Sequence, residues 1–258
     1  MGLSLSSKES CKCTKKSLFL LQYKAHMSSK FYAIIVAGGS GTRMGSSTPK
    51  QFLELGGRAI LQRSIEKFIS AVPDVRIVTV LPKDYIKTWK DYCLKVGFSF
   101  TQLIVEGGIT RFHSVKNALE KIPEGAIVAV HDGVRPLVTE ELIRSMLLMM
   151  ESERAVIPVV PMTDTLKVLR KEGDRLSPVK GAFVDRASVF GAQTPQFFRS
   201  EDLKLAYSLP FDTAFTDDAS VAEKKEIPLT YIEGERYNIK ITTPQDLDLA
   251  ERLLFTHT

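Results

Sequence analysis

The fold is decided by Phe31-Tyr-Ala-Ile-Ile-Val-Ala37 and by the glycine-rich Gly38-Gly-Ser-Gly-Thr-Arg43 that follows it directly. A short apolar run of this kind, ending at glycines, predicts a buried parallel strand. Glycines let the backbone approach an anion closely, and N–H groups turned inward can cradle it. The stretch therefore predicts an α/β fold with an anion-binding turn beyond its first strand.

The same alternation of strand and helix continues for more than a hundred residues. Further strands are expected at residues 76–81, 100–105, 126–130 and 155–160. Apolar residues at helical spacing predict helices at residues 60–69, at 112–122 and after the N-cap Thr139. The pattern predicts a Rossmann-like, mostly parallel sheet with helices on both faces. Ligands of such sheets bind beyond the carboxyl ends of the strands, so Gly38–Gly41, Gly107–Gly108 and His131–Asp132 should meet in one crevice.

The pattern changes after Pro161. Residues 165–169 and the residues from Leu176 onward predict a hairpin around Lys171-Glu-Gly-Asp174. We expect it to project as a β-arm at about residues 161–187. Closer to the C-terminus, Thr216-Asp217-Asp218 predicts the start of one helix, and Thr243 followed by Pro244 predicts the start of another.

Charge and composition exclude several classes of protein. The first 30 residues hold six lysines against one acid, which accounts for the whole net charge of +5 in the 258-residue chain. The body therefore has no global basic field, and no nucleic-acid partner is expected. No apolar run approaches the roughly 20 residues needed to cross a bilayer, so no membrane partner is expected. Three cysteines form no evident disulfide framework or zinc site, which favours a reducing, cytoplasmic setting.

The basic N-terminus differs from the rest. Residues 1–30 are rich in serine and lysine, and Met27 stands just before the globular pattern begins. We interpret them as a disordered tail or as the product of an upstream start; a transit-like peptide is the alternative, against which the lack of arginine weighs. Residues 31–258 are expected to form a single domain that includes the arm.

The glycine-rich turn has several interpretations. A P-loop would end in Gly-Lys-Ser/Thr, and a dinucleotide fingerprint would place a glycine where Met44 stands. That fingerprint also requires an acid after the second strand, where Pro82 and Lys83 follow instead. A tight turn with two solvated cations is a further alternative. Arg43 and Lys50 together suit a polyphosphate, because one is a planar fork and the other a point charge.

The turn, together with Pro49-Lys50-Gln51-Phe52, resembles the signature of sugar-phosphate nucleotidyltransferases, and more narrowly of the 2-C-methyl-D-erythritol 4-phosphate cytidylyltransferase family. The resemblance extends over about residues 31–254. Its further motifs occur in the family's order: Gly107-Gly-x-x-Arg-x-x-Ser-Val115, His131-Asp-Gly-Val-Arg-Pro136, Asp164-Thr-Leu-Lys167, Asp185-Arg186, Gln193-Thr-Pro-Gln-Phe197, Thr216-Asp-Asp-Ala-Ser220 and Asn238-Ile-Lys-Ile-Thr242.

This resemblance implies an enzyme that transfers CMP from CTP to 2-C-methyl-D-erythritol 4-phosphate, releasing pyrophosphate, in non-mevalonate isoprenoid biosynthesis. It implies Mg²⁺ held mainly by the CTP phosphates, without a dedicated protein metal site. It also implies a homodimer with shared active sites. Ribitol-5-phosphate cytidylyltransferase is the nearest alternative, because its fold and loop are similar. A nicotinamide-dependent oxidoreductase and a non-catalytic CTP-binding protein are more distant alternatives.

The resemblance also implies roles for individual residues. The catalytic cations are Arg43, Lys50, Arg186 and Lys240. The CTP-binding residues are Ala37, Gly38, Gly39, Gly41, Gly108 and Ser114. The acceptor-binding residues are Asp132, Arg135, Thr165 and Thr194. Thr165 and Arg186 are expected from the partner subunit's arm, and Lys240 from the last strand.

Simpler interpretations stand beside these roles. Lys240 alternates with Ile239 and Ile241, as on the outward face of a strand, and Arg135 suits an internal or dimer ion pair. His131 is expected to be a packed residue. Asp217 and Asp218 suit a helix cap better than a metal site. Ile109 departs from the acidic residue that family members often carry after the glycine pair, which puts any side-chain contact to the base in doubt.

Overall fold

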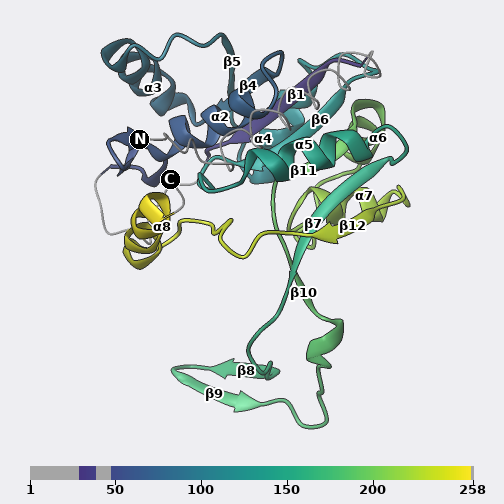
Figure 1. The fold of residues 1–258 in the computed structure, drawn as a ribbon. Coiled ribbons are helices and arrows are strands. Elements are labelled where there is room, and N and C mark those ends of the chain that lie inside the picture. Colours follow the sequence, from purple (N-terminus) through teal and green to yellow (C-terminus); the bar gives the residue numbers. More distant parts are fainter. Residues whose placement is uncertain (1–28, 39–47, 257–258) are drawn as a thin grey trace, which may run out of the picture.

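The fold is built on one eight-stranded sheet with the strand order β10-β7-β11-β6-β1-β4-β5, in which β12 also pairs with β7 (Figure 1). It is seen in a computed structural model that describes residues 29–38 and 48–256. The sheet strands are β1 (Phe31–Val36), β4 (Arg76–Leu81), β5 (Gln102–Glu106), β6 (Ile127–Asp132), β7 (Ala155–Pro161), β10 (Phe190–Ala192), β11 (Gln196–Arg199) and β12 (Thr230–Glu233).

Strand β1 lies inside the sheet and is buried along its whole length. It pairs in parallel with β6 on one side and with β4 on the other, so that Ile34 lies between Val130 and Val78. Side chains alternate between the faces of a strand, and both faces of this one are covered. The prediction of a buried parallel strand at this position is therefore confirmed.

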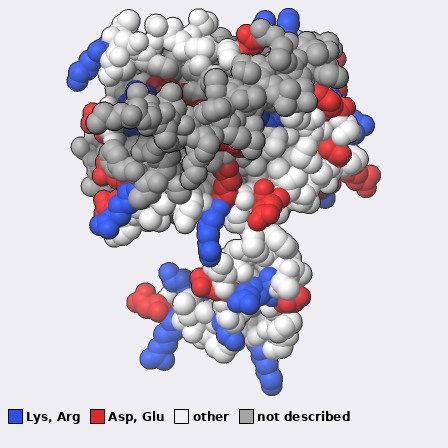
Figure 2. Space-filling model, in the orientation of Figure 1, with Lys and Arg blue, Asp and Glu red and all other residues white. Residues whose placement is uncertain are grey.

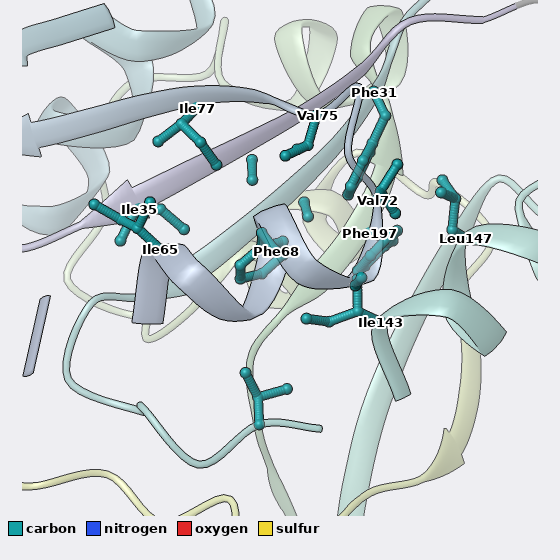
Figure 3. Packing of buried hydrophobic residues seen from close by; sticks show 14 of the residues in the cluster. Phe31, Ile35, Ile65, Phe68, Val72, Val75, Ile77, Ile143, Leu147 and Phe197 are labelled. Atoms are coloured by element: carbon teal, nitrogen blue, oxygen red, sulfur yellow. The ribbon is translucent and has the colours of Figure 1, made fainter. Parts of the chain in front are cut away.

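Helices cover the two faces of the sheet. The helices are α2 (Ile60–Ala71), α3 (Lys83–Val96), α4 (Arg111–Leu119), α5 (Glu140–Met149), α6 (Ser200–Ala206), α7 (Asp218–Lys224) and α8 (Pro244–Thr256). One apolar cluster joins Phe31 and Ile35 of β1 to Phe68 of α2 and Ile143 of α5, as Figure 3 shows. The opposite cluster joins Ile34 to α4, α6 and α7. The predicted α/β architecture with helices on both faces is thus confirmed.

The mostly parallel sheet contains an antiparallel insertion that the sequence analysis did not predict. Strand β11 lies between β6 and β7 and runs antiparallel to both, and β10 runs antiparallel to β7. Phe197 and Phe198 of β11 are fully buried on opposite faces of the sheet. The Gln193–Phe197 motif therefore connects two sheet strands and brings Thr194 next to the end of β6.

Other expectations need correction. Helix α3 was not predicted, although it begins after Pro82 and ends at Gly97, whose φ of 68° is favourable for glycine. His131 and Asp132 belong to β6 and do not follow it. Lys240 was expected on the last strand, but the last strand is β12 and Lys240 lies in an irregular segment before α8. The N-caps at Thr139 and Asp217 are confirmed by side-chain hydrogen bonds.

The hairpin after β7 projects away from the sheet. Strands β8 (Leu169–Glu172) and β9 (Arg175–Pro178) form it, and η3 (Arg186–Ser188) lies in the returning segment. Figures 1 and 2 show this arm (residues 162–189) separated from the body by a narrow neck, with side chains of both charges on its surface. The expected hairpin is present, although its first strand begins at Leu169 and not at Thr165.

The C-terminal helix α8 fixes the segment that precedes it. Ile241 and Ala250 form a small buried cluster with Leu55, Ile60 and Val134. Leu55 belongs to the short hairpin β2 (Glu54–Leu55) and β3 (Arg58–Ala59), which follows the 3₁₀ turn η2 (Lys50–Phe52). The N–H of Ile241 donates to the carbonyl oxygen of Val134 at 2.9 Å. These contacts hold Lys240 near the end of β6. No helix within the two described ranges is long and apolar enough to span a membrane.

Candidate active site

The carboxyl ends of β1, β5 and β6 open into one pocket, as expected for a sheet of this type. Helix α4 and the segment before α8 complete its described walls. Seven of the expected catalytic and binding residues line it: Ala37, Gly38, Lys50, Gly108, Ser114, Asp132 and Lys240. Three others, Gly39, Gly41 and Arg43, lie outside the described residues. The pocket therefore brings together glycines from two strand ends, two lysines and one carboxylate.

The loop after β5 is held in shape by Ser114. Its hydroxyl accepts a hydrogen bond from the N–H of Gly108 at 3.0 Å and donates to the carbonyl oxygen of Thr110 at 2.9 Å. A Cβ at position 108 would lie 2.3 Å from the Cβ of His113, so only glycine fits without rearrangement. Thr110 caps α4. The Gly-Gly motif thus permits a close turn of backbone into the pocket, and Ser114 fixes that turn.

Lys50 is positioned by its neighbour in sequence. Gln51 is buried, and its Nε2 donates to the carbonyl oxygen of Ala37 at 3.0 Å. The N–H of Ala37 donates to the carbonyl oxygen of Val80 at 2.9 Å. These bonds join the turn at Lys50 to the end of β1, so that the lysine lines the pocket although it lies thirteen residues after Ala37 in the sequence.

Asp132 is the electrostatic centre of the pocket. Among the described residues, three cations face its carboxylate: Lys240 Nζ at 2.9 Å, Arg111 Nε at 3.5 Å and Arg135 Nε at 3.5 Å. Burial alone would raise the pKa of Asp132, but Arg111, Lys240 and Arg135 outweigh that effect and lower the pKa well below its usual range. Asp132 is therefore ionised, and Lys240, whose side chain is 41% exposed, extends from it toward solvent.

Thr194 and Arg135 lie behind Asp132 and orient it. The Thr194 hydroxyl accepts a hydrogen bond from the N–H of Asp132 at 3.0 Å, and the Arg135 Nη1 donates to the carbonyl oxygen of Asn238 at 2.7 Å. The buried Asn238 Nδ2 donates to the carbonyl oxygen of Thr194 at 2.8 Å. These bonds join the end of β6, the turn before β11 and the Lys240 segment into one network.

His131 is a packed residue, as expected. It is fully buried, packs edge-on against Phe68, and its Nε2 lies 3.1 Å from the carbonyl oxygen of Arg135. Burial lowers the pKa of His131, and the nearby Asp132 carboxylate offsets only part of this effect, so that the pKa falls from 6.5 to about 4. His131 is therefore neutral at physiological pH, and it packs in the core next to the pocket residue Asp132.

The arm residues do not reach this pocket within one chain. Thr165 and Arg186 are both exposed, and Arg186 Nη1 donates to the carbonyl oxygen of Thr163 on the same arm at 2.9 Å. Neither residue lines the pocket. The structure thus divides the predicted site residues into a set that the body assembles and a pair that the arm carries away from it.

One charged residue among the described residues that line the pocket was missed by the sequence analysis. Arg111 lines the pocket next to Asp132 and also forms a two-pronged ion pair with Asp218, 107 positions away. It stands in the Gly107–Val115 motif, but a role for it was not assigned. Its spacing of three residues from Gly108, at the start of a helix that follows a strand, was the available indication.

Comparisons with known proteins agree with this geometry. The model of the family described as 2-C-methyl-D-erythritol 4-phosphate cytidylyltransferase matches residues 31–256. Proteins of that name from Bacteroides thetaiotaomicron and Porphyromonas gingivalis are each 46% identical; the matches cover 86% and 88% of this chain and 98% and 99% of theirs.

Solved structures give the same result. The crystal structure of 4-diphosphocytidyl-2C-methyl-D-erythritol synthase from Anaerococcus prevotii superposes with a TM-score of 0.70 at 30% identity, covering 88% of this chain and 96% of that one. The 2-C-methyl-D-erythritol 4-phosphate cytidylyltransferase of Francisella tularensis also gives 0.70 at 30% identity, with 87% and 99% covered. Both the sequence and the fold therefore place this chain in the 2-C-methyl-D-erythritol 4-phosphate cytidylyltransferase family.

Proposed function

We propose that the chain transfers CMP from CTP to 2-C-methyl-D-erythritol 4-phosphate and releases pyrophosphate, a step of non-mevalonate isoprenoid biosynthesis. The observation that carries this proposal is the pocket in which Lys50, the Gly108 loop and the Asp132–Lys240 pair meet. A glycine-lined turn suits a nucleotide, and two lysines at separate walls suit its phosphates. Family membership supplies the identity of the two substrates.

The proposed reaction is a direct displacement. A phosphate oxygen of the acceptor forms a bond to the α-phosphorus of CTP, and the bond to the β-phosphate oxygen breaks as pyrophosphate leaves. Both reactants are anions, so their repulsion is a large part of the barrier. Catalysis then depends on positioning and on cations that neutralise the developing charge. We assign Lys50 and Lys240 to that task, together with Arg43, which lies outside the described residues.

We propose that the base is recognised mainly by backbone groups. Ala37, Gly38 and Gly108 line the pocket; Gly39 and Gly41, which the family resemblance also assigns to CTP binding, lie outside the described residues. The Ser114 hydroxyl already accepts from Gly108 and donates to Thr110, which suits support of the loop as well as contact with the base. Ile109 is 97% exposed and has no polar atom in its side chain, so selection of cytosine at this position has to use the backbone.

The acceptor is proposed to bind beside Asp132. Thr194 and Arg135 are engaged with Asp132 itself, which supports a contribution through its orientation in addition to direct contact. Thr165 and Arg186 are proposed to come from the arm of a second copy of the chain. Two arm side chains, Leu176 and Phe183, are largely exposed, as expected of a surface that becomes covered on assembly. We therefore propose a homodimer with two shared sites.

Magnesium and the cellular setting also belong to this proposal. Asp132 is the acidic residue among the described residues that line the pocket, and both of its oxygens face cations of the protein. This donor set fits Mg²⁺ held chiefly by phosphate oxygens. When bound, the ion would reduce the charge of the triphosphate. We place the protein in the cytoplasm, because three cysteines in 258 residues suit a reducing compartment.

The test is pyrophosphate release by the purified protein with CTP, Mg²⁺ and one acceptor at a time. We expect turnover with 2-C-methyl-D-erythritol 4-phosphate and little with ribitol 5-phosphate, and we expect CTP to be preferred to ATP, GTP and UTP. Dominant activity with ribitol 5-phosphate would replace the proposed acceptor. A lack of pyrophosphate release with every acceptor would contradict the proposed enzymatic activity.

A further inference from the structure

The Arg111–Asp218 pair connects the pocket to the helices behind it. Arg111 Nη1 donates to Asp218 Oδ1 at 3.0 Å, and Nη2 donates to Oδ2 at 2.7 Å. Asp218 is fully buried and also accepts a hydrogen bond from the Tyr207 hydroxyl at 2.6 Å. The remaining face of the Arg111 guanidinium presents Nε to Asp132 Oδ1 at 3.5 Å. One fork thus contacts two carboxylates, and only an arginine has this geometry.

Helix stability alone does not account for this arrangement. Arg111 is the first residue of α4, where the helix dipole disfavours a cation. A buried ion pair is also weak evidence for stability, because apolar residues of similar volume often replace one without loss. Such a replacement would remove the contact with Asp132. The Arg111–Asp218 pair is therefore better explained by its effect on the position of the Asp132 carboxylate.

We propose that Arg111 is a positioning residue for the transfer reaction: Asp218 fixes its guanidinium, which in turn fixes the Asp132 carboxylate that holds Lys240 in the pocket. The proposal deepens the function proposed above and rests on it. It also gives a reason for the Thr216–Ser220 motif, because Asp217 caps α7 while Asp218 anchors Arg111. Arg111 acts through Asp132 and is not assigned a contact with the substrates.

The charges around Asp132 agree with this role. Arg111 approaches it from α4, Arg135 from the turn after β6, and Lys240 from the segment before α8; His131 precedes it in β6, and Lys50 lines the same pocket. Although burial opposes it, Asp218 and Asp132 together raise the pKa of Arg111 well above its usual value. The Coulombic attraction of Arg111 is the largest single contribution that lowers the pKa of Asp132, and Lys240 contributes through both its charge and a hydrogen bond.

The main test is the double variant Arg111→Gln/Asp218→Asn, which removes both charges and keeps a hydrogen-bonding amide at each position. We expect its melting temperature to stay near that of the wild type and kcat to fall about tenfold to a hundredfold, as misplaced catalytic groups cause. The matched control is Arg154→Gln/Asp202→Asn. Arg154 also holds a buried aspartate with two nitrogens, but this pair does not line the pocket, so its removal should leave kcat unchanged.

Two further measurements separate positioning from a merely structural role. In an Asp132→Asn background, removal of the Arg111–Asp218 charges should cost little more, because the residue through which Arg111 acts is already altered. The ¹³C carboxyl resonance of Asp132 should titrate at higher pH in the double variant than in the wild type. Full additivity, an unmoved titration, or wild-type kcat in a folded double variant would each overturn the proposal.

If the double variant does not fold, Arg111→Lys replaces it. Lysine keeps the charge beside Asp218 but cannot bridge to Asp132, so kcat should still fall while the fold is kept; wild-type kcat in this variant would overturn the proposal. The Asp132 titration does not depend on which substrate is used. An unmoved titration would therefore refute the role of Arg111 even if the enzyme is active. A wild-type protein that releases no pyrophosphate would refute the proposed function, and the titration would still show whether Arg111 acts on the Asp132 carboxylate.

Discussion

The pocket and the arm present their functional side chains in opposite ways. Asp132 is buried and held by three cations and by the Thr194 hydroxyl, so its position is fixed from several elements at once. Arg186 is exposed, and its guanidinium bonds to a carbonyl oxygen of its own arm. The body therefore fixes its own half of the proposed site, whereas the arm presents a half that a second copy would have to receive.

This difference gives the two halves of the site different roles. The side chains of the buried network have fixed positions within one chain, because packing and hydrogen bonds restrain each of them. The arm offers cations that become restrained only when a partner covers them. If the site is shared, loss of a pocket cation and loss of an arm cation should both reduce turnover. Loss of the pocket cation should inactivate the site of the same chain, whereas loss of the arm cation should inactivate the site of the partner chain.

The largest effect is expected for Lys50→Ala. Lys50 lines the pocket at the end of β1, and removal of a charge that stabilises the transition state should lower kcat by about a hundredfold or more. Initial rates of pyrophosphate release measure the effect. Lys90→Ala, on the exposed side of α3, is the control and should leave kcat unchanged. A Lys50 variant with near-normal turnover would remove the lysine from the proposed mechanism.

A mixing experiment tests the comparison directly. Lys50→Ala and Arg186→Ala should each be nearly inactive alone. After dissociation and random reassociation, half of the dimers contain one chain of each kind, and one of their two sites is intact. Activity should therefore recover to about a quarter of the wild-type value. No recovery, with heterodimers demonstrated by mass spectrometry, would show that Arg186 acts in its own chain.

The packed half of the site should also respond to pH through folding. The pKa of His131 is about 4 in the folded chain and about 6.5 in an unfolded one, so protonation favours unfolding. The contribution of neutral His131 to the unfolding free energy is complete above pH 6.5 and is lost as the pH falls toward 4. On the order of 2 kcal/mol of unfolding free energy should disappear between pH 7 and pH 5.

Urea unfolding of the wild type and of His131→Gln measures this loss. Glutamine does not titrate, so the stability of the variant should fall less steeply over the same range. Equal slopes for the two proteins would mean that His131 keeps an ordinary pKa in the folded state, and that the tight packing beneath the pocket does not exclude its charge.

Local features of the sequence predicted the body well. The run at Phe31 gave the central strand, and Thr139 gave the start of α5. The rule that ligands bind at strand ends predicted that Gly108 and Asp132 lie in one pocket, and both line it. Helix α3 could also have been predicted, because Pro82 precedes it, Gly97 follows it, and Trp89 is the buried centre of its apolar face.

The remaining features depend on contacts between distant segments. Strand β11 has only four residues, and its partners β6 and β7 lie far from it in the sequence. Lys240 alternates with isoleucines as a strand residue would, but the backbone next to it bonds to Val134 and not to a neighbouring strand. Arg111 and Asp218 are 107 positions apart. Spacing within one segment cannot predict such pairs, since tertiary packing alone brings them together.

The smallest effect on stability is expected for a substitution on the arm. Phe183 is 86% exposed, so Phe183→Ser should change the unfolding free energy of a single chain by no more than about 0.5 kcal/mol. If a second copy covers this side chain, the same change should weaken the dimer, which analytical ultracentrifugation over a dilution series would detect. An unchanged dimer affinity would remove Phe183 from the interface.

Phe68 differs from Phe183, because it is fully buried beneath the pocket and its loss would cost about 3–5 kcal/mol of unfolding free energy within one chain. An arm residue that matters only between chains, beside a core residue that matters within one, is the behaviour expected if the arm is built for a partner and the pocket is not.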